Sequence, residues 1–243
     1  MKMLVFAKRC VKEIVRDPLN LLFGLGFPVV LLFLMSAIQA NVPVAMFQIE
    51  SLAPGITVFG LSFMALFSAT LLAKDRESAF LQRLYTTPLR PSDFVLGYLL
   101  PILPIGLAQS LVCYLLALLL GLPLSVNLIY AMLLNLPATL FYISLGLLCG
   151  SIFTVKQVGG ICGALLTNLS AWLAGIWFDP QLIGGAFGKI ANLLPFIHAV
   201  ELEKAAVIGD FSQMLPHLCP VLIYAILVTI VAIFLFLRQM KRQ

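Results

Sequence analysis

LCPVLIYAILVTIVAIFLFL, residues 218–237, is a run of 20 residues without a charged side chain. A helix needs about 20 mostly apolar residues to cross roughly 30 Å of hydrocarbon at about 1.5 Å per residue. This run is therefore long enough to span a membrane. The whole chain shares its character, because 62% of the 243 residues are hydrophobic and only 10% are charged, against about 25% in an ordinary soluble domain.

Five further apolar runs precede this one. They extend over residues 19–38, 54–73, 94–122, 128–153 and 158–178. The first follows a basic stretch, as in a signal peptide, but its length leads us to expect a retained anchor. Prolines at positions 28, 101, 104 and 137 predict kinked or tilted helices. We expect an all-α integral membrane protein with six transmembrane helices.

Lysine and arginine predict the orientation of the chain, because they stay on the cytoplasmic side of short loops. With six spans, all of the 15 basic residues except Lys189 and Lys204 fall on one side. Both termini are therefore expected in the cytoplasm. The net charge of +5 reflects this bias, so we expect no nucleic acid partner.

We expect residues 1–243 to form a single domain with conspicuous segments outside the spans. Residues 1–18 place apolar side chains on one helical arc and charges on the other, which predicts a helix lying in the membrane surface. It could be a basic anchor, a partner-binding helix, or both. Residues 179–215 mix glycines, acids and short apolar stretches. We expect one or two short helices there, dipping into the outer leaflet, with a plain outer loop as the alternative.

Motifs for catalysis and metal binding are missing. The five cysteines have no paired spacing, so no disulfide framework or metal cluster is indicated. Gly188-Lys189 fails as a phosphate-binding loop, because Ile190 stands where Ser or Thr is needed. His198 lacks the second histidine of a zinc protease, and we expect it on a helix surface or at the membrane interface. The chain is therefore not expected to be an enzyme.

Ion coupling is also unexpected. All ten acids lie at or outside the ends of the predicted spans, whereas ion-coupled transporters usually keep an ionisable residue inside the membrane. The spans hold neutral polar residues, which more often bond helix to helix than contact a substrate. These are Gln109, Asn135, Thr167 and Asn168. The protein is then a passive channel, an assembly subunit or the membrane part of a machine powered elsewhere.

KDRESAFLQRLYTTPLR, residues 74–90, separates these alternatives. On a helical projection Phe80, Leu81, Leu84 and Tyr85 form an apolar face around Glu77. Such a ridge beside the membrane is either tucked under the bundle or inserted into a groove on another protein.

The stretch resembles a pattern shared by the permeases of type-2 ABC exporters, approximately R-E-x-G-T-L-E-x-L-x-x-[ST]-P. The matching residues are Arg76, Glu77, Leu81, Arg83, Leu84, Thr87 and Pro88. Ala79, Phe80 and Gln82 depart from the pattern. The resemblance covers nearly the whole chain, and its other matches are Asp17-Pro18, Gly97, Gln109, residues 194–200, Lys204 and Gly209.

This resemblance implies a permease that dimerises and binds two copies of a separate ABC ATPase. The chain itself would bind no cofactor, because the partner would hold ATP and Mg²⁺. Residues 74–90 would form the coupling segment, with the ATPase contacted by Arg76, Glu77, Phe80, Leu81, Leu84, Tyr85, Thr87 and Pro88. The dimer seam and substrate path would include Phe59, Phe63, Ser68, Asn168 and Trp172.

The expected location is the plasma membrane of a bacterium or archaeon, in contact with lipid. An apolar path with Phe and Met and few charges favours export of an amphipathic compound, such as a drug, an antibiotic peptide or a lipid-like molecule. Export of a lipid-linked polysaccharide would instead require aromatic stacking rows and a more polar lining. A passive channel or assembly subunit without an ATPase is the remaining alternative.

Overall fold

The computed structural model describes residues 2–42, 47–78, 80 and 91–240. All regular structure in these residues is helical. The elements are α1 (Lys2–Val15), α2 (Pro18–Leu21), the π-helical η1 (Leu22–Gly26), α3 (Phe27–Asn41), α4 (Ile49–Glu77), α6 (Pro91–Leu119), α7 (Asn127–Ile152), α8 (Val155–Val158), the π-helical η3 (Gly159–Leu166), α9 (Thr167–Leu173), α10 (Pro180–Ile183), α11 (Gly185–Leu193), α12 (Pro195–Ile208) and α13 (Phe211–Met240).

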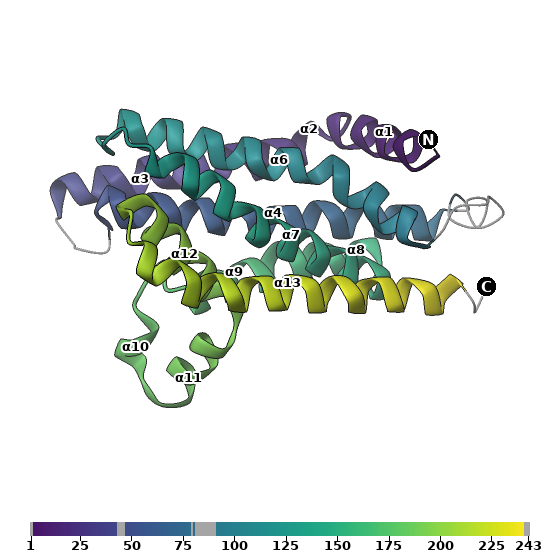
Figure 1. The fold of residues 1–243 in the computed structure, drawn as a ribbon. Helices are drawn as coiled ribbons and strands as arrows, with labels where there is room; N and C mark the ends of the chain where they lie inside the picture. The colour runs from purple at the N-terminus through teal and green to yellow at the C-terminus, as the bar shows by residue number, and fades with distance from the viewer. Residues whose placement is uncertain (1, 43–46, 79, 81–90, 241–243) are drawn as a thin grey trace.

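Five helices in the described residues are long and apolar enough to cross a membrane, and they run along one bundle (Figure 1). They cover Leu22–Asn41, Ile49–Glu77, Asp93–Leu119, Asn127–Ile152 and Phe211–Phe236. The exposed face of α13 is made of large apolar side chains, as expected for contact with lipid. The predicted all-α membrane fold is confirmed.

α4 is the centre of the bundle and is buried along nearly its whole length. Small residues allow α7 to approach it closely. A Cβ atom added at Gly146 would lie 2.1 Å from the carbonyl oxygen of Ala65, and one at Gly150 would lie 2.5 Å from that of Ala69. The close approach of backbones at small residues is typical of helix packing in membranes.

The predicted apolar run at residues 158–178 lies in a helical stretch from Val155 to Leu173. This stretch packs along α4, but it is not among the five candidate spans. Its polar residues, which include Lys156, Gln157 and Asn168, lower its mean hydropathy. α7 ends beside the end of α4, and α13 begins beside the start of α7. Residues 155–173 therefore supply the helical part of the chain's return along the bundle.

The segment at residues 179–215 holds three helices before α13, where the sequence predicts one or two. Gly184 and Gly185 adopt φ values of 65° and 56°, which separate α10 from α11. Leu194-Pro195 separates α11 from α12. α12 is largely buried and packs against α4, α7 and α13, whereas α10 and α11 project from the bundle (Figure 1).

α1 packs on the start of α6. Its buried side differs in part from the predicted apolar arc. Phe6, Cys10 and Ile14 are buried, whereas Val11 and Val15 of that arc are exposed. α1, the end of α4, the start of α6, α8 and the end of α13 gather at one end of the molecule (Figure 1). We call it the basic end, because Lys8, Arg9, Lys12, Arg16, Lys74, Arg76, Lys156 and Arg238 lie on these elements or the turns beside them.

Candidate functional site

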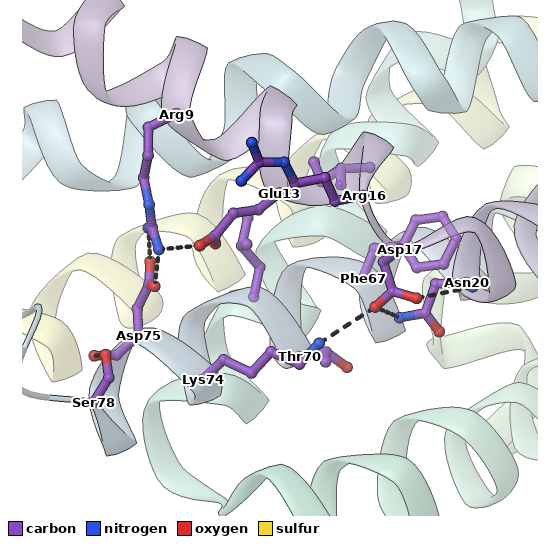
Figure 2. A pocket seen from close by; sticks show the side chains of 12 residues that line it. Arg9, Glu13, Arg16, Asp17, Asn20, Phe67, Thr70, Lys74, Asp75 and Ser78 are labelled. Atoms are coloured by element: carbon purple, nitrogen blue, oxygen red, sulfur yellow. Dashed lines mark hydrogen bonds and ion pairs between the residues drawn. The ribbon is translucent and has the colours of Figure 1, made fainter.

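A cavity of about 480 Å³ lies at the basic end, between α1, α2 and the last turns of α4 (Figure 2). It has three acidic and three basic side chains over an apolar floor. The lining residues are Arg9, Glu13, Arg16, Asp17, Asn20, Thr70, Lys74, Asp75 and Ser78, with Ile14, Phe67 and Leu71 below them. Positive and negative groups are thus balanced around one hollow.

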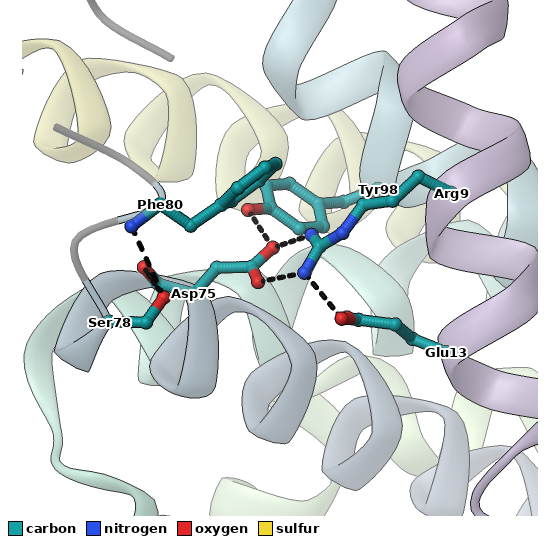
Figure 3. A network of polar contacts seen from close by, with 6 residues as sticks. All are labelled: Arg9, Glu13, Asp75, Ser78, Phe80 and Tyr98. Carbon is teal, nitrogen blue, oxygen red and sulfur yellow. Dashed lines mark hydrogen bonds and ion pairs between the residues drawn. The ribbon is translucent and has the colours of Figure 1, made fainter. Parts of the chain in front are cut away.

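Asp75 and Arg9 form the central ion pair of this site (Figure 3). The Asp75 side chain is only 3% exposed, and both of its oxygens accept hydrogen bonds from the Arg9 guanidinium, which lies 2.6 Å from Oδ1. The Tyr98 hydroxyl donates to Oδ2 at 2.7 Å, and Arg9 also donates to Glu13 at 2.5 Å. A buried carboxylate is stable only with such partners. The pair therefore fastens α1 to α4 and α6.

Charge on Arg9 is secured by this arrangement. Burial lowers the pKa of Arg9, but the hydrogen bonds and negative charge of Asp75 outweigh it and raise the pKa above its ordinary value. The neighbouring Cys10 is completely buried, and burial raises the pKa of its thiol to about 12. Cys10 is therefore a neutral packing residue and not a nucleophile.

Phe80 lies directly under α1. The Arg9 guanidinium is 4.0 Å from the centre of its ring, within the range of a cation–π contact, and the Phe6 ring stacks with its centre 6.3 Å away. Phe6 in turn fits against Gly97, where an added Cβ atom would lie 2.3 Å from the Phe6 ring. Gly97, which belongs to the sequence resemblance, is thus needed for α1 to approach α6.

Arg76 and Glu77 fasten the end of α4 to the corner between α7 and α8. Arg76 donates to the carbonyl oxygens of Ser151 and Phe153, at 2.6 Å for Phe153. Glu77 accepts the backbone N–H of Val155 at 2.8 Å. Helix ends leave such carbonyl and N–H groups without partners of their own. Both side chains therefore cap the neighbouring helices from α4.

Lys74 completes the site on the side of α2. Its ammonium group lies 3.3 Å from Asp17, which also accepts hydrogen bonds from the side chain and backbone of Asn20. Asp17 precedes the short helix α2, so it caps that helix and anchors it to α4. The start of the first predicted span is thus bonded to α4, the helix that also binds α1.

The side chains of this site hold helices together. In the described part of the chain, no three His, Cys, Asp or Glu side chains gather in a way that could hold a metal ion. The acids of the cavity are engaged with cations or amide groups of the protein itself. What the arrangement does is join α1, α2, α4, α6 and the α7–α8 corner into one connected unit.

Of the residues predicted to contact an ATPase, Arg76, Glu77 and Phe80 are described, and each has a contact within the chain. Glu77 stays exposed, so one face of it is open to a partner. The others are outside the described residues: Leu81, Leu84, Tyr85, Thr87 and Pro88. Their predicted role stays a prediction.

The predicted path residues separate into two groups. Phe59 and Phe63 pack edge to face at 6.0 Å, between Phe27 and Trp177, and are nearly buried. Asn168 and Trp172 lie exposed on α9.

Ser68 is completely buried and donates to the carbonyl oxygen of Ile143 at 2.9 Å. Its small side chain permits the close approach of α7 in the same chain. Its predicted place at the dimer seam and path stays a prediction.

Glu203 was missed by the sequence analysis, which placed every acid at or outside the span ends. It lies on α12, outside the five candidate spans, but it is completely buried inside the bundle, where the Tyr114 hydroxyl donates to its Oε2. The pairing of Arg9 with Asp75 is also not among the sequence predictions. Gln109 and Asn135 do bond helix to helix as predicted, to the backbone of Thr57 at 3.3 Å and to the Ser110 hydroxyl. Thr167 and Asn168 bond within their own helical stretch.

Comparison with known proteins gives one family. The model of the family described as "ABC-2 type transporter" matches residues 1–206. No curated protein matches the chain. The matched region includes α1, the basic-end cavity and most of α12.

Proposed function

We propose, from the premise that the chain belongs to the ABC-2 type transporter family, that it is the permease subunit of an ATP-driven exporter. As a member of this family it is a multi-pass membrane protein and a transmembrane component of an ABC transporter, and not itself the ATPase. The proposal adds the direction, the cargo and the partners. Two copies of a separate ABC ATPase would hold ATP and Mg²⁺ and drive two copies of this chain.

The observation that carries the proposal is the connected unit at the basic end. The chain leaves α4 at Ser78, directly after the residues that bind α1 and the α7–α8 corner. It enters α6 at Pro91, just before the residues that pack on Phe6. A force applied to the segment between them would act on α1, α4, α6 and α7 together. This is what an ATPase needs if its closure is to move the membrane helices.

The orientation follows from charge. The basic end would face the cytoplasm of a bacterial or archaeal cell, because lysine and arginine favour that side of the plasma membrane. Residues 155–173 would be a sixth span, which returns the chain across the membrane before α13. An even number of spans agrees with α1 and the end of α13 lying at the same end of the molecule.

An amphipathic cargo is favoured by the aromatic residues near the predicted path. Phe27, Phe59, Phe63 and Trp177 form a row of tilted and edge-to-face contacts with ring centres 5.6 to 6.3 Å apart. Phe59 and Phe63 are 5% and 7% exposed, so their ring faces are not open for a sugar to stack on. Closed ring faces do not supply the stacking rows that a polysaccharide path would require, so drug-like or lipid-like cargo is favoured.

A second copy of the chain would cover the outer face of η3 and α9. This face carries Gly160, Ala164, Asn168 and Trp172, and an atom added at Gly160 would meet nothing within 4 Å. Small residues and a polar amide are typical of interfaces between membrane helices, since an amide facing lipid is unfavourable. Within the described ranges, the Asn168 amide nitrogen donates to the carbonyl oxygen of Ala164 at 2.8 Å, and the amide oxygen would be available to a partner.

ATP hydrolysis tests the proposal. The chain would be co-expressed with the candidate ABC ATPases of its own cell, purified and reconstituted in lipid. A Glu77→Ala, Leu84→Ala double variant should bind the ATPase about thirtyfold more weakly, because the two lost contacts together cost on the order of 2 kcal/mol. Turnover and co-purification should fall together.

A matched control is the Lys189→Ala, Leu193→Ala double variant. It removes one charged and one apolar side chain that are exposed on α11, away from the basic end. It should leave turnover and co-purification unchanged. If no ATPase co-purifies with the wild type, or the Glu77 and Leu84 variant behaves like the control, a passive channel or assembly subunit is the better explanation.

A further inference from the structure

Glu203 is the only acidic residue that is completely buried in the described part of the chain. It lies on α12, which at 14 residues is too short to span a membrane and packs between spanning helices. Its partner Tyr114 lies five residues before the end of α6 at Leu119, or roughly 8 Å along the helix axis. The carboxyl group is therefore inside the bundle, near the end opposite the basic end.

Among the residues that the structure describes, the surroundings of Glu203 offer one hydrogen bond and no cation. Tyr114 donates to Oε2, while Oε1 is buried without a partner. The residues three and four positions away on α12 are all apolar and buried. They are Ala199, Val200, Ala206 and Val207. Lys204, the next residue along the chain, instead bonds to Glu201 at 2.8 Å.

In the described residues, Tyr114 is the group whose hydrogen bond acts on the Glu203 carboxyl. His198 of α12 and His217 of α13 have Nδ1 atoms 3.0 Å apart, and Glu201 and Lys204 of α12 bond to each other. Cys113 of α6 lies beside Gln109, Tyr142 of α7 beside Phe196, and Tyr130 of α7 beside Phe211, while Tyr224 of α13 is partly buried. Cys219 of α13, Glu50 of α4 and Lys189 of α11 are exposed. The remaining titratable groups of α4, α6, α7 and α13 lie toward the basic end.

A carboxylate in this position would be an uncompensated buried charge. Such a charge costs several kcal/mol, and a carboxyl group avoids the cost by keeping its proton. Burial raises the pKa of the Glu203 carboxyl to about 8, and the hydrogen bond from Tyr114 offsets only part of this rise. A protonated carboxyl also suits the site chemically, because it can still accept the Tyr114 hydrogen bond.

We propose that Glu203 is a proton-binding site: it holds a proton while its carboxyl is bonded to Tyr114 of α6, and it releases that proton to water when this contact opens. The ligand is a proton from the aqueous phase at the end opposite the basic end. Release breaks the O–H bond of the carboxyl and leaves a carboxylate that favours the open arrangement. The proposal goes beyond the proposed exporter, because it holds whatever the cargo and whether or not an ATPase is bound.

Infrared spectroscopy of the purified chain tests this directly. A protonated carboxyl group has a C=O stretching band that a carboxylate lacks, and a detergent without ester groups leaves that region clear. The wild type at pH 6 should show this band, and it should disappear on titration with a midpoint near pH 8. Glu203→Gln should lack the band.

Glu201→Gln is the matched control, since Glu201 is two residues away, partly exposed and paired with Lys204. It should keep the band and its midpoint. Absence of the band from the wild type at pH 6 would overturn the proposal, and so would its persistence in Glu203→Gln. If Glu203→Gln does not fold, the wild-type titration alone decides.

Amide hydrogen exchange of α12 tests the link to opening. A carboxyl whose pKa is higher in the closed state than in water binds more protons when closed. Opening therefore becomes easier as pH rises from about 4.5 to about 8. Relative to Glu203→Gln at the same pH, exchange of α12 in the wild type should increase by up to about tenfold per pH unit in this window. A ratio that stays constant with pH would contradict the proposal.

Discussion

Two carboxyl groups are buried in the described residues, and the chain treats their charge in opposite ways. Asp75 has a guanidinium and a phenol as partners and lies near the basic end, so it is part of an ion pair. Glu203 has only a phenol and an apolar surrounding, which favours the neutral acid. One is suited to fastening helices together and the other to responding to pH.

For both Asp75 and Glu203, the local sequence carries a signal of burial. Asp75 follows Leu71 and Leu72 by four and three positions, so it shares their helical face although the run of charges around it suggests a solvated loop. Glu203 has apolar residues at every position three or four away, which is an equally usable signal. Their partners could not be found in this way. Arg9 is 66 positions from Asp75, and no local pattern indicates such a pairing.

Replacing Arg9 by alanine should destabilise the chain, because Asp75 then keeps a buried charge without its cation. We expect a loss of about 2 kcal/mol in the free energy of unfolding, less than for a fully buried pair because Arg9 is partly exposed. Thermal unfolding of the detergent-purified chain would measure it. Lys12→Ala, on the exposed side of α1, should have little effect. Adding Asp75→Asn to Arg9→Ala should recover part of the loss, and equal losses in the Arg9 and Lys12 variants would contradict this account.

Replacing Tyr114 by phenylalanine should move the titration of Glu203 to more alkaline pH. The Tyr114 hydroxyl stabilises the charged carboxylate, so its hydrogen bond lowers the pKa of Glu203, and removing it should raise that pKa above about 8. The midpoint of the infrared titration measures the shift. Tyr142→Phe removes another buried phenol, one that packs against Phe196, and should leave the midpoint unchanged. A shift toward acidic pH in the Tyr114 variant would show that the sign is wrong.

Among the elements, continuous apolar runs are predicted well and mixed ones are not. The runs at residues 54–73 and 128–153 correspond to α4 and α7, because nothing interrupts their helices. The run at residues 158–178 extends too far, since α9 ends at Leu173 and Gly175 adopts a φ of 72°. The sequence predicts short helices in this segment but not that α12 packs inside the bundle. The local signal that one of its charged residues faces inward is the set of apolar neighbours of Glu203.

The crossing of α4 and α7 predicts a strong effect at one glycine. A Cβ atom at Gly146 would lie 2.0 Å from the Ser68 hydroxyl and 2.1 Å from the Ala65 carbonyl oxygen. Because a backbone atom cannot move aside alone, Gly146→Ala should force the helices apart and cost about 2 kcal/mol. Thermal unfolding checks this. Gly163→Ala is the matched control, as its Cβ would meet only Leu66 at an ordinary 3.6 Å. Similar melting of the two variants would mean that the crossing is looser than described.

In the whole molecule, different interactions hold the helices together at the two ends of the bundle. The basic end joins its helices through ion pairs and caps, whereas the opposite end joins them through the packing of α12 against α4, α7 and α13. The positions of the lysines and arginines along the sequence predict the basic end, since these residues cluster. The packing at the opposite end depends on contacts between distant segments, which no run or motif in this chain indicates. A permease that opens alternately to the two sides of the membrane would need different interactions between its helices at the two ends.

The proposed dimer makes a further prediction, because the exposed face of η3 and α9 carries small residues and the Asn168 amide, which is unfavourable in lipid. In a Cys219→Ser background, which removes the exposed native thiol, Asn168→Cys should cross-link to a second chain in native membranes when a thiol-specific linker is added. Ile226→Cys is the control, as it is also exposed on α13 but lies among large apolar side chains suited to lipid. A dimer band on electrophoresis for Asn168→Cys, absent for Ile226→Cys, would assign the seam to α9. Equal bands would indicate random collision, and a band for Ile226→Cys alone would move the interface to α13.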